Sequence, residues 1–420
     1  MQQREANAAT VERMFEAEPV LVDVARAGDV VPGMGERTIL TSGPRTDASA
    51  YRGGQRRAVA FGAIHEGLAA DEDDAWRQIE AGEILVEPCQ DHGCIGSVAG
   101  IYTASMPVFV VKNRVHGNLA FCNLYEGASP RRLNYGVYDE EVAAGLRYLE
   151  DVLGPVLGAA VREAGEIPLK PIVRRALNMG DELHSRNTAA SLLFGQAIFP
   201  ALLELRERHQ EAVESALGFL RENDYFFLRL SMAAAKATAD ASHGVEGSSV
   251  VSGMCVSGLE FAIRVSGLED WIRGPLPISR AKLFDGFTED DIEWLGGESC
   301  MTEAIGLGGF AQATAPSLQA YQGGTVDAMR ETNLSMYEIT VAENPTFKIP
   351  YLAYRGTPTG IDVFAVAETG ILPTIDAGLA GKDGGQIGAG TLLAPLECFE
   401  AAAAAYLERY GARTTAAVDV

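Results

Sequence analysis

The chain contains two apolar segments, Ile84-Leu85-Val86-Glu87-Pro88 and Met106-Pro107-Val108-Phe109-Val110-Val111, on either side of a glycine-rich stretch. Short apolar runs bounded by Gly and Pro are typical of β-strands. Residues 19–24 and 57–64 have the same character, and an acidic amphipathic helical pattern follows the second of them. Because strands alternate with helices, residues 1–138 are predicted to form a mixed α/β domain.

The pattern becomes almost wholly helical over residues 139–245, where Pro155 and Pro200 are expected at the first position of helices. Residues 246–420 are glycine-rich and mixed again, and they end with a helix and a disordered-looking tail at Thr414–Val420. The expected fold class is therefore mixed α/β (α+β). It has two mixed domains flanking a helical middle domain.

The charge and composition of the chain exclude several classes of partner and of protein. It has 420 residues, 47% of them hydrophobic, and a net charge of −23. This charge argues against nucleic acid and anionic membrane as partners, although a local cationic site could still bind a small anion. The six cysteines form no disulfide framework, no signal segment is visible, and no run of about 18 apolar residues predicts a membrane span. We expect a cytoplasmic protein.

The segment Asn178–Asn187 concentrates polar chemistry directly before an apolar helical run. Asp181 is predicted as the N-cap of that helix, with His184 and Asn187 on the same face and Arg186 beside them. A helix N-terminus is also a favourable place for an anion. The segment therefore predicts catalytic or binding residues, and the alternative is a capped helix with a solvated first turn.

Two further candidates lie in a loop and in a helix. His92, in the loop Glu87–Cys94, could act as an acid or base. The Cys and His spacing around it matches no common zinc site, so we expect no metal there. Lys236 stands among alanines of a predicted helix at Phe226–Ala241, where it either reaches into a cleft as an anion ligand or pairs with Asp240.

Glycine-rich segments near the C-terminus supply the remaining candidates. Glu303 is followed by a glycine cluster whose backbone N–H groups could hold an anion. The segment Arg355–Asp362 is predicted to be a rigid turn that displays a guanidinium, hydroxyl groups and a carboxylate. The substrate-binding candidates from these segments are Gly308, Gly309, Arg355, Thr357, Asp362 and Gln386.

The chain resembles the YlbE/AllG family of bacterial proteins. The resemblance extends from Pro32 to the loop at residues 386–390, and its most specific parts are Met179–Asn187, Thr302–Phe310 and Arg355–Asp362. It departs from the family pattern at Gln90 and Tyr125. One branch of this family is associated with oxamate carbamoyltransferase of allantoin breakdown, which works with an FdrA-type protein. The resemblance thus implies carbamoyl transfer between a ureido or amide acid of the oxalurate type and phosphate, giving carbamoyl phosphate.

This reaction needs cations near phosphate and a group that manages a proton at an amide nitrogen. Lys236, Arg355 and the glycine cluster are candidates for the first task. His184 or His92, oriented by Asp181 or Glu303, are candidates for the second. We expect no metal, no organic cofactor and a homo-oligomer.

Two alternatives remain open. The first is a metal-dependent amidohydrolase acting on a ureido or amide substrate, with Asp181, His184 and His92 as ligands. The second is a non-catalytic subunit that docks an FdrA-like protein through glycine-rich surfaces.

Overall fold

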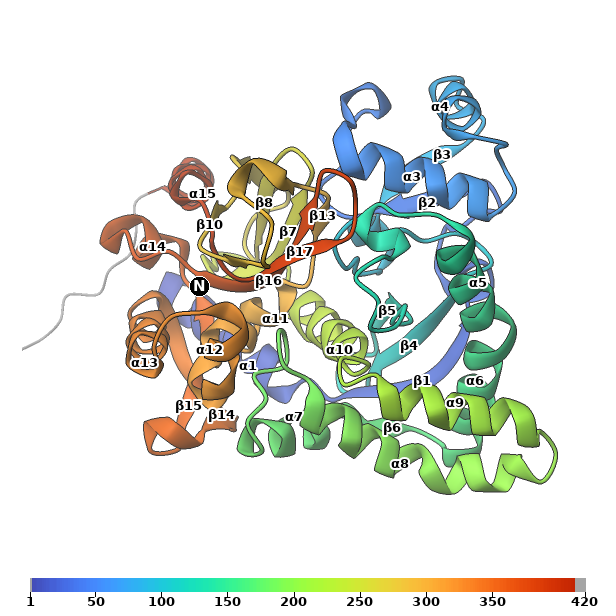
Figure 1. Ribbon diagram of the computed structural model, residues 1–420. Helices are drawn as coiled ribbons and strands as arrows, with labels where there is room; N and C mark the ends of the chain where they lie inside the picture. The colour runs from blue at the N-terminus through green and yellow to red at the C-terminus, as the bar shows by residue number, and fades with distance from the viewer. Residues whose placement is uncertain (1, 412–420) are drawn as a thin grey trace, which may run out of the picture.

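The computed structural model describes residues 2–411, so the predicted tail at Thr414–Val420 lies outside the described residues. Helices and strands are interleaved along the chain, and several separate sheets are present (Figure 1). The expected mixed α/β (α+β) class is therefore confirmed. One hydrophobic core contains residues from all three predicted domains, from Leu21 to Tyr406. The division at residues 138 and 245 stays a prediction.

Two four-stranded antiparallel sheets form the centre of the molecule. The first has the order β5 (Leu119–Asn123), β4 (Pro107–Asn113), β1 (Pro19–Arg26), β6 (Ile167–Pro168). The second has the order β13 (Gly296–Gly297), β7 (Val251–Ser257), β8 (Phe261–Val265), β9 (Trp271–Gly274).

A third sheet is formed by strands from the C-terminal part of the chain. Its order is β10 (Ile278–Ser279), β17 (Gln386–Leu393), β16 (Thr374–Gly381), β12 (Ile292–Glu293), and β11 (Lys282–Leu283) also pairs with β17. Two pairs of strands complete the set: β14 (Thr340–Ile349) with β15 (Arg355–Ile361), and the parallel pair β2 (Thr38–Thr41) with β3 (Leu85–Pro88).

The helices surround these sheets. In the N-terminal half they are α1 (Gln3–Glu16), α2 (Ala27–Val30), α3 (Gly53–His65), α4 (Glu72–Glu80), α5 (Glu140–Tyr148), α6 (Gly154–Ala164), α7 (Leu169–Asn178), α8 (Thr188–Arg206). In the C-terminal half they are α9 (Gln210–Glu222), α10 (Leu228–Ala241), α11 (Met301–Ala304), α12 (Gln319–Gln322), α13 (Val326–Ser335), α14 (Val363–Thr369), α15 (Leu396–Tyr410).

Helix α10 is the central element. It contacts β4 and β5 of the first sheet, and it also contacts β7 and α11 (Figure 1). Its alanine-rich middle, from Ala233 to Ala237, is almost fully buried. Small side chains let neighbouring backbones approach closely, so this sequence suits a helix enclosed between layers.

Three predicted local structures are wrong, and a fourth, the helix start at Asp181, is described below with the candidate active site. Residues 57–64 belong to the helix α3 instead of a strand, because a short apolar run fits a buried helix equally well. Pro200 lies inside α8 instead of at a helix start. Arg355–Asp362 forms strand β15 with Asp362 as the N-cap of α14, so it is not a turn.

By length and composition, α8 alone among the described helices could cross a membrane. This is weak evidence, because core helices of globular proteins pass the same test. α8 packs against α6, α7 and α9 in the fold, and 44% of its most apolar 18-residue window is buried.

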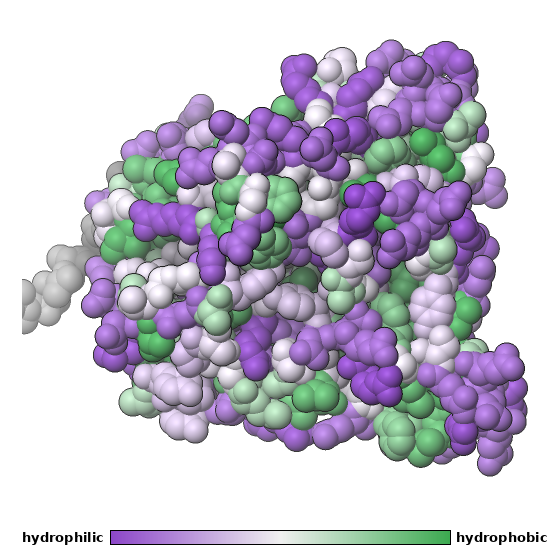
Figure 2. Space-filling model, in the orientation of Figure 1, coloured by the Kyte–Doolittle hydropathy of each residue, from purple (hydrophilic) through white to green (hydrophobic). Residues whose placement is uncertain are grey.

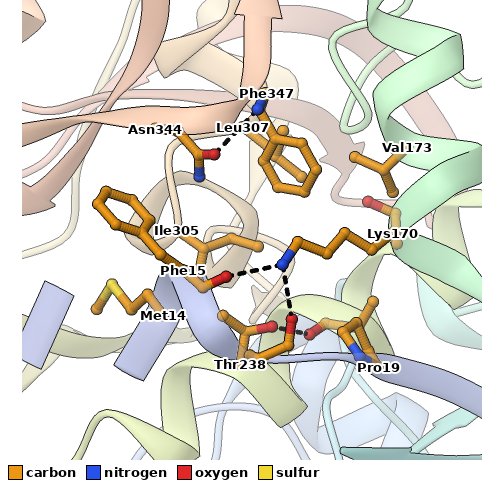
Figure 3. Close-up of a pocket in the computed structure, with 13 residues that line it drawn as sticks. Met14, Phe15, Pro19, Lys170, Val173, Thr238, Ile305, Leu307, Asn344 and Phe347 are labelled. Carbon is orange, nitrogen blue, oxygen red and sulfur yellow. Dashed lines mark hydrogen bonds between the residues drawn. The ribbon is translucent and has the colours of Figure 1, made fainter. Parts of the chain in front are cut away.

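A small cavity of about 20 Å³ lies beside the end of α1 (Figure 3). The Lys170 ammonium group donates to the carbonyl oxygens of Phe15 at 2.7 Å and Ala17 at 3.2 Å. A cation that binds the last carbonyls of a helix caps its C-terminus. This cavity has room for about one water molecule, and its lysine already has partners in the fold.

Candidate active site

A cavity of about 270 Å³ is lined by several segments of the chain, which are distributed between Ser97 and Ala389. Its wall combines two arginines with tyrosine, serine and amide side chains. The polar residues that line it are Ser97, Tyr125, Arg132, Tyr135, His184, Ser185, Tyr225, Arg229, Ser299, Tyr321 and Gln386. Within residues 2–411 no carboxylate side chain lines the cavity, so the arginines make its wall cationic.

His184 lies on this wall and is held by Glu303. The ring Nδ1 atom of His184 is 2.8 Å from Oε1 of Glu303 and 3.2 Å from the hydroxyl oxygen of Thr302. Its Nε2 atom has no hydrogen-bond partner among the described residues, so this nitrogen is available to a ligand. Burial lowers the pKa of His184, and the adjacent Glu303 carboxylate raises it. The carboxylate has the larger total effect, so the pKa of His184 lies above its ordinary value.

The glycine cluster supports this pair instead of lining the cavity. The backbone N–H of Gly309 donates to Oε1 of Glu303 at 2.9 Å, and that of Gly308 donates to the carbonyl of Glu182 at 2.8 Å. A Cβ atom at Gly308 would lie 2.1 Å from Glu303 Oε1 and 3.0 Å from His184 Cβ. Glycine is therefore required where the segment of Glu303 meets the segment of His184.

Two more buried carboxyl groups lie behind the pair. Glu182 accepts the backbone N–H of His184 at 2.6 Å, and Asp376 donates its own backbone N–H to Glu303 at 3.0 Å. Burial and the charge of Glu303 raise the pKa of Asp376 to about 7. Burial and the charge of Asp376 raise the pKa of Glu182 well above its usual value. These groups can hold protons near neutral pH next to His184.

Arg132 and Arg229 are the residues that the sequence analysis missed. Arg132 donates to the hydroxyl of Tyr125 at 3.3 Å and to Oε1 of Gln386 at 3.0 Å. Arg229 donates to Oδ1 of Asn123 at 2.9 Å. Both are buried, and neither forms an ion pair with a carboxylate among residues 2–411. Arg229 could have been noticed in the sequence, because it stands among apolar residues at the start of α10, just as Lys236 stands among alanines.

The segment at residues 181–187 is a loop instead of the start of a helix, because Leu183 adopts a φ of 74°. Asp181, His184 and Asn187 therefore do not share a helix face. The carboxylate of Asp181 still accepts the backbone N–H of Ala190 in the first turn of α8 at 2.8 Å, and it also pairs with Arg186. Asn187 donates to the carbonyl of His184 at 2.9 Å.

Among the predicted site residues, His184 and Gln386 line the cavity. Six others do not line the cavity but lie behind its wall, where they contact His184 or residues next to it. They are Asp181, Arg186, Asn187, Glu303, Gly308 and Gly309. The other five do not line it either.

Two of these five are cations with carboxylate partners. Lys236 is buried, and its ammonium group is 2.6 Å from the carboxylate of Asp240, which also pairs with Arg264. Arg355 is exposed, pairs with Glu343 at 2.6 Å and stacks on Tyr337. The pairing of β14 with β15 brings Glu343 beside Arg355.

The other three also have partners elsewhere. His92 contacts Glu87 at 2.8 Å and the carbonyl of Pro32 at 2.7 Å. Thr357 is buried in β15, and Asp362 accepts the hydroxyl of Ser249 at 2.9 Å. Among the described residues, no group of three His, Cys, Asp or Glu side chains could hold a metal ion, and the ligand set Asp181, His184 and His92 is not assembled.

Comparison with known proteins identifies relatives over almost the whole chain. Residues 84–299 match the family described as oxamate carbamoyltransferase subunit AllG. The chain is 38% identical over 413 residues to the oxamate carbamoyltransferase subunit AllG of Escherichia coli K12, covering 97% of this chain and 98% of that protein. It is 41% identical over 412 residues to the uncharacterized protein YahG of the same organism, covering 97% of this chain and 86% of the relative.

A crystal structure of a conserved protein of unknown function from Enterococcus faecalis V583 has the same fold. Its TM-score is 0.93 at 39% identity, and the match covers 97% of this chain and 98% of that one. The resemblance found in the sequence is thus confirmed. The chain belongs to the AllG family.

Proposed function

We propose that this chain is the substrate-binding and catalytic subunit of a carbamoyltransferase. It would move a carbamoyl group between a ureido or amide acid of the oxalurate and oxamate type and phosphate. The observation that carries the proposal is the cavity itself, in which the His184 imidazole faces the same space as Arg132 and Arg229. The name of the AllG relative supports the reaction class.

The reaction can be written on these groups. An oxygen of phosphate attacks the carbamoyl carbon of the ureido acid and gives a tetrahedral intermediate. The bond from this carbon to the amide nitrogen then breaks, and the nitrogen takes a proton from the His184 imidazolium. Carbamoyl phosphate and the amide acid are the products. In reverse, neutral His184 accepts the proton from the amide nitrogen.

The arginines match the charges of these reactants. Both phosphate and the acid carboxylate are anions, and a guanidinium binds either through two parallel hydrogen bonds. Because Arg132 and Arg229 have no carboxylate partner in the described part of the chain, binding an anion would offset a buried positive charge without breaking an ion pair. The hydroxyls of Ser97, Ser185 and Ser299 line the same cavity and could donate to the charged intermediate.

The test is carbamoyl phosphate formation from a panel of ureido acids and phosphate, with the chain alone and with an FdrA-type partner protein. His184→Ala should lower the turnover number at least about 100-fold, since general acid–base catalysis contributes roughly 10²- to 10⁴-fold. His209→Ala is the matched control, because His209 lies between α8 and α9, outside the cavity lining.

Unchanged turnover of the His184 variant would remove this residue from the mechanism. If no mixture with any partner forms carbamoyl phosphate, the proposed reaction is refuted. Activity that is lost on metal chelation and restored by a divalent cation would favour the amidohydrolase alternative.

A further inference from the structure

An apolar surface on α8 and α9 lies outside the candidate active site. Leu192, Phe199 and Leu203 are 60%, 45% and 46% exposed, although large apolar side chains are usually buried. A groove of about 390 Å³ runs between the helices, and its far wall is formed by Leu217, Leu220 and Arg221 of α9 and by Asp224. Its two charged residues are of opposite sign. Figure 2 shows hydrophobic colouring at the lower right of the molecule, where α8 and α9 lie in Figure 1. We call this region, lined by Leu192, Gly195, Gln196, Phe199 and Leu203, the α8 surface.

We propose that the α8 surface is an interface between two copies of this chain. The first argument is charge. Each chain has a net charge of −23, so two copies repel one another, and a contact that brings no acidic side chains together adds least to this repulsion. Residues 187–203 contain no charged side chain at all. The α8 surface thus offers a neutral contact on a strongly acidic molecule.

The second argument is the spacing of its residues. In an antiparallel pair of α8 helices related by a two-fold axis, each residue faces its mirror position in the partner. Leu192 and Phe199 are equally far in sequence from the midpoint between Gly195 and Gln196. A two-fold axis through that midpoint therefore places Leu192 of each copy against Phe199 of the other copy. Such self-complementarity is what a two-fold interface requires.

The third argument is Gly195. Glycine inside a helix costs about 1 kcal/mol relative to alanine, and a Cβ atom at Gly195 would meet nothing within 4 Å in this chain. No contact within the described fold therefore requires glycine here. A second α8 crossing at this point would use it, because small residues let helices pack at short interaxial distances.

The interface would also touch the wall of the active-site cavity. The Ser191 hydroxyl, on the groove, donates to the carbonyl of Asp224 at 2.8 Å and accepts the backbone N–H of Phe227 at 3.0 Å. Tyr225, between these two residues, lines the cavity. Dimerisation would thus restrict the motion of residues 224–227, which include the cavity-lining residue Tyr225.

Sedimentation velocity of the wild-type chain over a wide concentration series tests the proposal, and we expect a dimer. Phe199→Glu should raise the dissociation constant of the dimer roughly 100-fold or more, because each copy would bring an unpaired charge into the contact. Leu85→Glu is the matched control, since Leu85 is 52% exposed on β3, and it should leave the dimer intact. Circular dichroism checks that both variants remain folded.

A cross-link locates the axis. All six native cysteines are buried, so Gln196→Cys adds an accessible thiol beside the proposed axis. Mild oxidation should then give a covalent dimer, whereas Leu85→Cys should not. A wild-type chain that stays monomeric at every concentration overturns the proposal and leaves the α8 surface to a different protein. A dimer that Phe199→Glu does not weaken overturns it as well.

Discussion

Arg131 and Arg132 are adjacent in sequence but have opposite environments. Arg131 is exposed and pairs with Asp139 at 2.7 Å, whereas Arg132 is buried against the cavity. Arg132→Gln should weaken the binding of inorganic phosphate about 10- to 100-fold, since a hydrogen bond to a charged group contributes roughly 1.5–3 kcal/mol. Arg131→Gln should leave binding unchanged. Isothermal titration calorimetry measures both, and equal losses in the two variants would contradict the assignment.

The Glu303 carboxylate favours the protonated form of His184. Because Glu303 raises the pKa of His184 against the effect of burial, Glu303→Gln should lower that pKa below the wild-type value. An NMR titration of the His184 ring checks this without any assay of activity. In the proposed reaction, the limb of the pH–rate profile that His184 controls should shift to lower pH. Glu343→Gln, which changes the exposed partner of Arg355, is the control.

At this scale the sequence named His184 and Glu303 among several candidate acid–base residues without deciding between them, and it did not identify the arginines of the cavity. His184 and Glu303 each lie in a distinctive motif, whereas nothing in the sequence distinguishes Arg132 from Arg131. Tyr125 and Tyr135, which are near Arg132 in sequence, and Gln386, which comes from a distant segment, pack around its guanidinium group. The contact with Gln386 forms only when the chain folds. Lys236 shows the converse, because an intrahelical partner, Asp240, accounts for its position.

The contact between η6 (Gly308–Phe310) and β16 fixes the elements behind the active site. A Cβ atom at Gly309 would lie 2.0 Å from the backbone oxygen of Thr374, which cannot move without displacing the strand. Gly309→Ala should therefore destabilise the fold by about 2–4 kcal/mol, since overpacking of a buried site is among the large destabilising effects. Urea unfolding measures the change.

The control for this substitution is Gly145→Ala in α5. A Cβ atom there would meet nothing within 4 Å, so it should stabilise the helix by up to about 1 kcal/mol. Equal free energies of unfolding for Gly309→Ala and the wild type would show that η6 and β16 are not held as tightly as described.

Elements with one clear period were predictable, and elements whose residues suit two structures were not. The strand β4 and the helices α4, α10 and α15 lie where the sequence pattern predicted a strand or a helix. The segment at residues 57–64 was mistaken for a strand because an apolar run of this length has no decisive period. β15 was mistaken for a turn because its Gly and Pro residues are typical of turns, and only pairing with β14 overrides them.

The whole molecule should become more stable as the pH falls from about 7.5 to about 5.5. Burial raises the pKa of Asp376 and of Glu298 to about 7 and that of Asp181 to about 6. In this window the folded state therefore binds more protons than the unfolded state, so the free energy of unfolding rises as the pH falls. The raised pKa of His184 acts in the same direction. His243, whose pKa burial lowers to about 4, acts in the opposite direction.

Urea unfolding at the two pH values measures the sum of these effects. Asp376→Asn isolates one of them, because it removes the ionisable group while the amide keeps an acceptor for Gln312 and Gln322. The variant should show a smaller change of stability with pH than the wild type. Greater stability at the higher pH, or an unchanged slope in the variant, would contradict the prediction.

The order in which the cavity wall appears along the chain has a consequence for biosynthesis. Its lining begins at Ser97 and ends at Ala389, so a ribosome must release nearly the entire polypeptide before the wall can close. Truncated products that end before β17 lack Gln386, the acceptor that orients Arg132. A chain that ends before β17 therefore has an incomplete cavity wall, and the wall is complete only after nearly the whole polypeptide has been made.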